Sequence, residues 1–249
     1  MASSQAQAEI TERRLRPLYD AIDNRQNKKA LQIADKIIKK QEDLYCAKAL
    51  KAIVCQRMGR QEEGNSLIDE VVKACPGDQA TLQAATMYYR ETGDGAEPKV
   101  VDLYTQAAEQ YPGNQEILTH LFMAFVRVGN YHKQQQTALQ LHKAFPDNGP
   151  YYCWRVMSIV MQAHKSTDGS LANSMFLPLA EKLMEKYVAE KKLDVEEEVK
   201  LYLMVLEKQG KPEKRLEVVQ GPLGQYNTQH PTLSTAFRCG GLKHKFTKL

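Results

Sequence analysis

Several features are scarce in this 249-residue sequence. Aromatic residues make up 8% of it, and glycine and proline number only 14 and 10, which is few for a sandwich or barrel built on many turns. No apolar run approaches the roughly 18 residues of a membrane span, and residues 1–10 lack the apolar core of a signal peptide. These absences favour a helical protein that is neither secreted nor inserted in a membrane, and we expect it in the cytoplasm.

Motifs for metal binding and catalysis are also missing. The five cysteines, Cys46, Cys55, Cys75, Cys153 and Cys239, form no C-x-x-C pair, and the six histidines show no H-E-x-x-H spacing. We therefore expect reduced thiols that serve mostly as small core residues, and neither a metal nor a cofactor. Neither a G-x-S-x-G elbow nor a G-x-x-x-x-G-K-[ST] phosphate loop occurs, so the sequence predicts no catalytic residue.

The net charge of +4 conceals an uneven distribution. Residues 1–60 carry 13 basic and 7 acidic side chains, residues 61–120 carry 3 and 11, and residues 121–249 carry 18 and 12. A basic N-terminal surface can attract RNA or a ribosome, although charged runs on helices are more often ordinary solvated faces. The overall charge is too small to indicate DNA binding. The candidate ribosome- or RNA-facing residues are Lys28, Lys29, Lys39 and Lys40.

An internal period is the strongest signal. Three glycine-to-proline intervals of 17 residues occur, at Gly59 and Pro76, Gly95 and Pro112, and Gly129 and Pro146. Successive prolines are 36 and 34 residues apart, which is typical of tetratricopeptide (TPR) repeats, each a pair of antiparallel helices. The position 34 residues before Gly59 is Arg25, and apolar residues follow it in register. The fold class predicted is all-α, a TPR-like right-handed α-α superhelix with glycine in the turns and proline at the ends of helices.

The same pattern predicts the organisation of the chain. We expect a flexible N-terminus over residues 1–10, an array of about six helix pairs over 11–224, and an irregular tail over 225–249. The polar stretch 164–174 interrupts the period and predicts a long connection. No polar capping helix closes the array, although an independent solenoid normally needs one.

One short motif resembles a cofactor-binding loop. The run from Arg90 through Gly93 to Gly95 fits the R/Q-x-x-G-x-G/A loop with which Gcn5-like acetyltransferases hold acetyl-CoA. Such a loop works when a strand precedes it and its amides open onto a helix N-terminus. Here the preceding segment 82–89 reads as a repeat helix, so we interpret the motif as a repeat turn.

Several stretches of the sequence resemble the auxiliary subunits of the NatB N-terminal acetyltransferase. The N-terminal run RRLRPLYD and the later runs LFMA and MFLPLAE carry the resemblance, together with shorter matches between them. It covers residues 11–224 and is carried by Arg13, Arg14, Leu15, Arg16, Pro17, Leu18, Tyr19, Asp20, Asn24, Asn27, Lys28, Cys46, Gln56, Arg57, Gly59, Leu121, Phe122, Arg127, Gly129, Met175, Phe176, Leu177 and Pro178.

This resemblance implies a non-catalytic, TPR-rich scaffold that enfolds a Gcn5-like catalytic subunit. The catalytic subunit holds the acetyl-CoA, and the complex acetylates nascent chains beginning Met-Asp, Met-Glu, Met-Asn or Met-Gln at or near the ribosome. Family members are several times longer, so we expect this chain to correspond to their N-terminal portion. Inward-facing residues between Leu121 and Leu206 are expected to contact the partner. A generic TPR adaptor that binds acidic C-terminal tails is the alternative.

Overall fold

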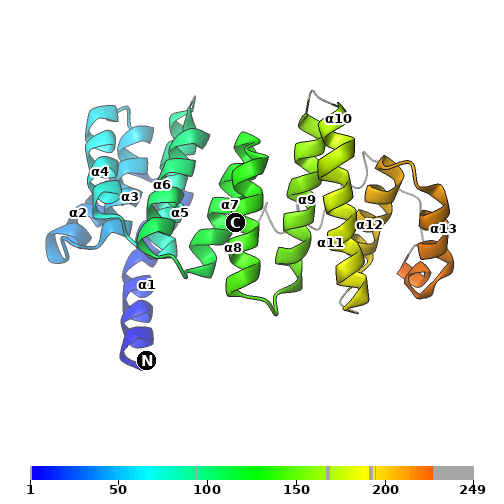
Figure 1. Ribbon diagram of the computed structural model, residues 1–249. Helices are drawn as coiled ribbons and strands as arrows, with labels where there is room; N and C mark the ends of the chain where they lie inside the picture. Colours follow the sequence, from blue (N-terminus) through cyan, green and yellow to red (C-terminus); the bar gives the residue numbers. More distant parts are fainter. Residues whose placement is uncertain (1, 94, 167–168, 191–192, 194, 227–249) are drawn as a thin grey trace. The chain divides into compact units, whose positions relative to one another are not determined.

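The computed structural model describes residues 2–93, 95–166, 169–190, 193 and 195–226, and every element within them is helical (Figure 1). This arrangement confirms the all-α fold class. The helices are α1 (Ala2–Asp23), α2 (Asn27–Lys40), α3 (Tyr45–Arg57), α4 (Gln61–Ala74), α5 (Gln79–Thr92), α6 (Ala96–Gln110), α7 (Gln115–Val128), α8 (Tyr131–Ala144), α9 (Gly149–Lys165), α10 (Gly169–Leu171), the π-helical segment η1 (Ala172–Phe176), α11 (Leu177–Ala189), α12 (Glu196–Lys208), α13 (Pro212–Gln220) and the 3-10 helix η2 (Pro222–Tyr226).

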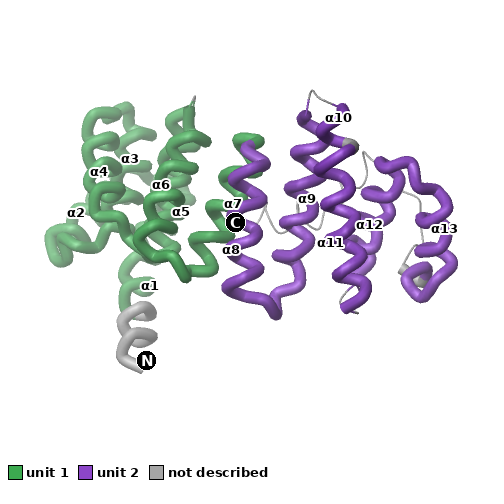
Figure 2. The backbone as a smooth tube through the Cα atoms, in the orientation of Figure 1, with its two compact units in different colours: residues 1–129 green, residues 130–249 purple. Residues whose placement is uncertain are grey.

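The chain forms two compact units, residues 1–129 and 130–249 (Figure 2). In unit 1, α3 packs against its pair mate α4 and also against α5, the first helix of the next pair. In unit 2, α9 packs against α8 and α11, and α12 packs against α11 and α13. Each unit therefore shows the pair-on-pair packing that helical repeats use to bury apolar faces too small to be stable alone.

Three turns between paired helices, at residues 25, 59 and 210, share one hydrogen-bonding pattern. After α3, Gly59 N donates to Gln56 O at 3.0 Å and Arg60 N to Cys55 O at 2.9 Å, with Gly59 at φ 77°. This is a Schellman motif, whose left-handed residue is usually glycine. The turn residues singled out in the sequence all lie between helices, at Gly59, Pro76, Gly95, Pro112, Gly129 and Pro146.

Small residues set the spacing of the helices in unit 1. Gly64 of α4 lies so close to its neighbours that a Cβ atom there would be 3.2 Å from both Ala52 O and the Tyr88 hydroxyl. Alanines on the facing helices α3 and α5, including Ala52 and Ala85, are fully buried. Such close approach lets the apolar faces of adjacent helices interdigitate, and each fully buried leucine or isoleucine contributes about 1.5–3 kcal/mol relative to an exposed one.

Side-chain caps begin three of the helices, α5, α7 and α8. Asp78 accepts a hydrogen bond from Thr81 N at 2.9 Å at the start of α5, and Asn114 accepts from Glu116 N and Ile117 N at the start of α7. A cap of this kind contributes about 1 kcal/mol. Local chemistry thus accounts for the start of α5 and α7, which follow Pro76 and Pro112.

The connection predicted over 164–174 is the main local prediction that was wrong. Helix α9 continues to Lys165, and residues 169–176 are helical and lead directly into α11. Within them the Leu177 amide donates to Ala172 O, the five-residue spacing of a π turn. Ala172 and Leu177 are buried with Ala163, so packing against α9 stabilises helix where the polar composition predicted a loop.

The segments predicted to flank the repeat array, residues 1–10 and 225–249, have different outcomes. Helix α1 begins at Ala2, so residues 2–10 continue the first repeat helix instead of preceding it. Alanine, glutamine and glutamate in that stretch favour helix. The tail predicted over 225–249 lies outside the described residues apart from the last two residues of η2.

Candidate interaction surfaces

Seven basic side chains on the first helix pair are exposed and form no ion pair within the described ranges. We call them the basic surface. Arg14, between two of them, donates to Gln41 Oε1 at 3.0 Å. The members of the basic surface are Arg13, Arg16, Lys28, Lys29, Lys36, Lys39 and Lys40.

The lysines of the basic surface lie on one side of α2. At 100° per residue, its five lysines fall within a sector of about 120°. The opposite side contains Ala30 and Ala34, both fully buried. The sequence predicted four of these lysines as ribosome- or RNA-facing residues, Lys28, Lys29, Lys39 and Lys40. It did not predict Lys36. The helical periodicity of α2 places Lys36 in the same sector as the other four lysines, so a helical-wheel projection of the sequence could have identified it.

The loop that resembles an acetyl-CoA site is a helix–helix turn. Gly93 ends α5 at φ 93° and Gly95 precedes α6 at φ 81°, while Asp94 lies outside the described residues. Arg90 pairs with Glu97 through Nε at 3.3 Å, and Arg127 approaches the same carboxylate at 3.6 Å. The arginine of the motif is therefore used in an ion pair between helices, and the strand that a cofactor loop requires is replaced by α5.

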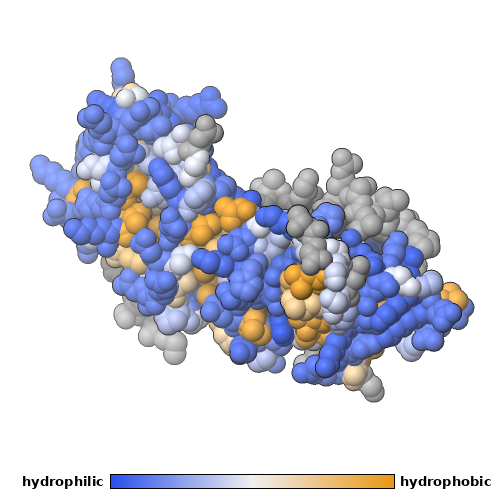
Figure 3. All heavy atoms as spheres, turned by 45° about the horizontal axis from the view of Figure 1, so that its top comes forward, coloured by the Kyte–Doolittle hydropathy of each residue, from blue (hydrophilic) through white to orange (hydrophobic). Residues whose placement is uncertain are grey.

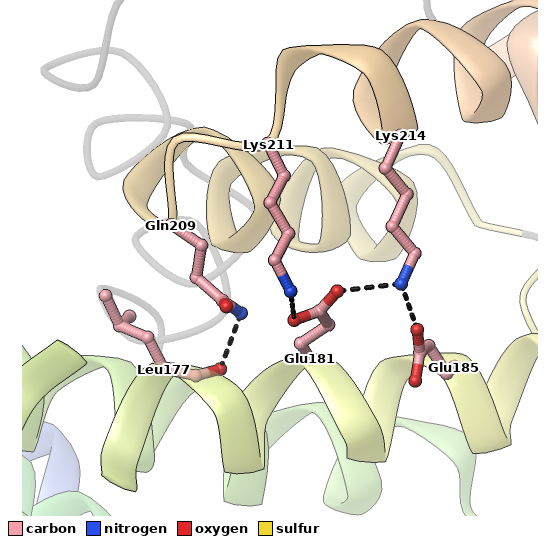
Figure 4. Close-up of polar contacts among 6 residues, drawn as sticks. All are labelled: Leu177, Glu181, Glu185, Gln209, Lys211 and Lys214. Atoms are coloured by element: carbon pink, nitrogen blue, oxygen red, sulfur yellow. Dashed lines mark hydrogen bonds and ion pairs between the residues drawn. The ribbon is translucent and has the colours of Figure 1, made fainter. Parts of the chain in front are cut away.

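A buried carboxylate links α11 to the start of α13 in unit 2 (Figure 4). Glu181 of α11 has a side chain only 7% exposed, and its two oxygens accept hydrogen bonds from Lys211 Nζ at 2.5 Å and Lys214 Nζ at 2.7 Å. Lys214 also contacts Glu185, and Gln209 Nε2 donates to Leu177 O at 2.9 Å. We call these side chains the Glu181 cluster.

The Glu181 cluster perturbs the pKa values of its members. Desolvation is the largest influence on Glu181 and raises its pKa, but the hydrogen bonds from Lys211 and Lys214 and the positive charge of Lys214 act against it, and the pKa is lowered overall. The hydrogen bonds to Glu181 and Glu185 raise the pKa of Lys214. The cluster is therefore charged at neutral pH and joins α11 to α13.

An apolar row is exposed next to the π turn. Leu171, Met175 and Leu179 are 39%, 48% and 37% exposed, and their spacing of four residues places them along one side of the continuous helix from α10 into α11. On the face drawn in Figure 3, apolar atoms reach the surface in small patches between hydrophilic side chains. We call the three residues the apolar row, and rows of this kind can bind a partner helix.

In the described part of the chain, His120 and His142 pack against tyrosine rings and Cys46, Cys55 and Cys153 are buried, whereas His132 and His164 are exposed. His120 stacks on Tyr104 with ring centroids 5.2 Å apart. Burial lowers the pKa of His120, and Arg90 lowers it further, against the opposing effect of Glu116. No group of three potential metal ligands occurs among the described residues, and none of the described helices is long and apolar enough to cross a membrane.

The pair-on-pair packing, the 34-residue period and the glycine turns define a TPR-type helical repeat protein. Consistent with this class, a chain in the solved structure of Naa15/Naa10 bound to HypK-THB shares the fold with a TM-score of 0.59 at 17% identity, covering 88% of this chain and 32% of that one. The family described as "Psidin, N-terminal TPR repeats region" matches residues 12–247, and the chain belongs to this family.

Curated relatives of this chain are named as NatB auxiliary subunits, and they confirm the resemblance found in the sequence. The chain is 47% identical over 238 residues to the rat protein "N-alpha-acetyltransferase 25, NatB auxiliary subunit", covering 95% of this chain and 24% of the relative. Identity to the human protein of the same name is 49% over 215 residues, covering 86% of this chain and 22% of the relative. The chain thus spans about a quarter of the length of these relatives.

Proposed function

We propose that this chain is the N-terminal part of a non-catalytic NatB auxiliary subunit that acts in the cytoplasm. The observation that carries the proposal is the 47% identity over 95% of the chain to a protein of that name. Its partner would be a Gcn5-like catalytic subunit, and the complex would acetylate nascent chains beginning Met-Asp, Met-Glu, Met-Asn or Met-Gln. A repeat scaffold supports this role because it can order a partner's loops without supplying a catalytic group.

The apolar row offers a contact for such a partner. The three side chains are still 37–48% exposed, so burying the remaining apolar surface would contribute about 0.5–1.5 kcal/mol each. Leu171, Met175 and Leu179 also fall within the segment predicted to contact the catalytic subunit.

Co-expression tests the proposal. The chain is produced with a NatB catalytic subunit, and both co-purification and acetylation of a Met-Asp peptide are measured against the catalytic subunit alone. We expect a complex with raised activity that the triple change Leu171→Ser, Met175→Ser and Leu179→Ser weakens. Lys182→Ser with Lys186→Ser, exposed on the same helix, serves as the matched control. Failure of the two wild-type chains to associate would contradict the proposal.

The basic surface supports a second role, contact with ribosomal RNA. Its seven cations have no acidic partner in the described structure, and phosphate contacts by such groups make binding strongly dependent on salt. Co-sedimentation with ribosomes should therefore fall steeply between about 50 and 200 mM salt. Charge reversal at Lys28, Lys29, Lys39 and Lys40 should flatten that dependence, and retention unaffected by the four changes would exclude the surface.

A further inference from the structure

A π turn interrupts the helix that carries the apolar row. Over the segment η1 (Ala172–Phe176), the Leu177 amide donates to Ala172 O, five residues earlier. In a regular α-helix the same amide would donate to the carbonyl of residue 173, so the turn contains one extra residue. Single π turns inside α-helices are frequent at functional sites.

Pro178 explains why this turn is widened. Proline has no backbone N–H, and inside an α-helix its ring clashes with the carbonyl four residues earlier, which here belongs to Ser174. Pro178 is the second residue of α11, and the helix continues into it from η1 without a break. Widening the preceding turn relieves the clash without ending the helix.

The extra residue decides which side chains are buried beside the apolar row. Ala172 and Leu177 belong to one buried cluster with Ala163 of α9, and they are only 9% and 5% exposed. Residues five apart are separated by about 140° around a regular α-helix and would face different sides. The π turn brings both onto the side that packs against α9, and it thereby fixes which side chains stay outside.

The same turn aligns the apolar row with the helix axis. When the π turn is counted as one inserted residue, Leu171 and Leu179 are separated by about 20° around the axis. Eight residues of regular α-helix would separate them by about 80°. An ordinary ridge of residues four apart is inclined by about 26° to the axis, so the apolar row is straighter than such a ridge.

The surface along the row is also uncharged. Residues 169–180 contain no charged side chain, although charged residues make up 26% of the sequence. Ser170 and Ser174 are exposed and small, which leaves room for the side chains of a packed helix. The surface offers no cation to a nucleic acid, and in charge it complements the apolar side of a helix.

We propose that the apolar row binds one amphipathic helix of the partner, which lies lengthwise along α10 and α11. Two ridges of the ordinary inclination cross at about 50°, whereas a ridge near the axis favours an angle of about 30° or less. The partner helix would then contact Leu171, Met175 and Leu179 with apolar side chains from successive turns of one side. The inference rests on the proposed function, because the partner is the NatB catalytic subunit, and it specifies how that subunit docks.

Photo-cross-linking in the co-expressed complex tests how the partner helix lies. p-Benzoylphenylalanine replaces Leu171, Met175 or Leu179 in turn, and mass spectrometry identifies the residues of the catalytic subunit that react. We expect all three positions to react with one helix, at sites that advance by about three or four residues from one position to the next. Lys143, exposed on α8, is the control position and should not react with that helix.

The outcomes separate this inference from the proposed function. Association of the two chains with reactions on separate elements of the catalytic subunit would overturn the inference alone. Failure of the wild-type chains to associate would overturn both.

Two deletions test the π turn itself, and both carry Pro178→Ala so that the shortened helix contains no proline. Removing Ser174 converts the π turn to an α turn and keeps Leu171 aligned with Leu179, so affinity for the catalytic subunit should match that of Pro178→Ala alone. Removing residue 173 as well rotates Leu171 by about a further 100°. Affinity should then fall about two- to tenfold, as in Leu171→Ser. Equal affinity of the two deletion variants, with equal helix content by circular dichroism, would show that the alignment of the row is not needed.

Discussion

The buried carboxylate of the Glu181 cluster should stabilise unit 2 measurably. Replacing it by Glu181→Gln keeps its size but removes its charge. Two charge-assisted hydrogen bonds would contribute about 1.5–3 kcal/mol each if fully shielded. Lys211 and Lys214 are, however, 44% and 36% exposed, and exposed ion pairs contribute only about 0.2–1 kcal/mol each. We therefore expect the free energy of unfolding to fall by about 1–2 kcal/mol, between these limits.

Tryptophan fluorescence during urea unfolding is the appropriate assay. The sequence contains one tryptophan, Trp154, and it lies on α9 in unit 2. Its emission therefore reports the unit that contains the cluster without a signal from unit 1. Glu185→Gln is the matched control, because Glu185 contacts Lys214 but is 44% exposed, and its loss should cost about 0.5 kcal/mol or less.

The pH dependence follows from the lowered pKa of Glu181. A carboxyl with a lowered pKa in the folded state contributes stability that is complete above its unfolded value of about 4.3 and is lost as the pH falls through the folded value. The difference between wild type and Glu181→Gln should thus be constant from about pH 5.5 to 8 and shrink below about pH 4. A Glu181→Gln protein as stable as wild type at pH 7, or a control that loses as much, would refute the reasoning.

Three further predictions concern the packing of unit 1. Gly64→Val should lower the free energy of unfolding by about 1–3 kcal/mol through overpacking, because even a Cβ would lie 3.2 Å from Ala52 O; circular dichroism during urea unfolding measures it. Because burial lowers the pKa of His120, the unfolded chain takes up its proton first, and stability should fall as the pH drops below about 6.5. Among the described cysteines, Cys75 is not fully buried and should be alkylated first by iodoacetamide, whereas burial raises the pKa of Cys46 to about 11; mass spectrometry identifies the order.

A different experimental result would contradict each of these three predictions. Wild-type stability of Gly64→Val would show that the helices can separate without loss. A His120→Gln protein with the same loss of stability at acid pH as wild type would assign that loss to other groups. Alkylation of Cys46 before Cys75 would show that α3 opens more readily than its packing indicates.

The sequence determined the class of fold and the position of most turns. Glycine in a left-handed turn, proline after a helix and apolar residues at helical spacing act within one helix pair, so Gly59, Pro112 and Gly129 could be placed from local backbone energetics. The exposure of the lysines on α2 followed from the same periodicity. The repeat register places Arg25 at the position equivalent to Gly59, but only the tertiary structure shows that Arg25 is left-handed, with φ 55°.

Only the tertiary structure decided which charged groups meet. Glu181 and Lys211 are 30 residues apart in sequence, and Arg57 and Glu91 are 34 residues apart. Helix formation over 169–176 likewise depended on packing against α9, which outweighed a polar composition. Periodicity shows which side of a helix is buried, but the faces that come together, and hence the pairing and pKa values of their charges, depend on how the helix pairs stack.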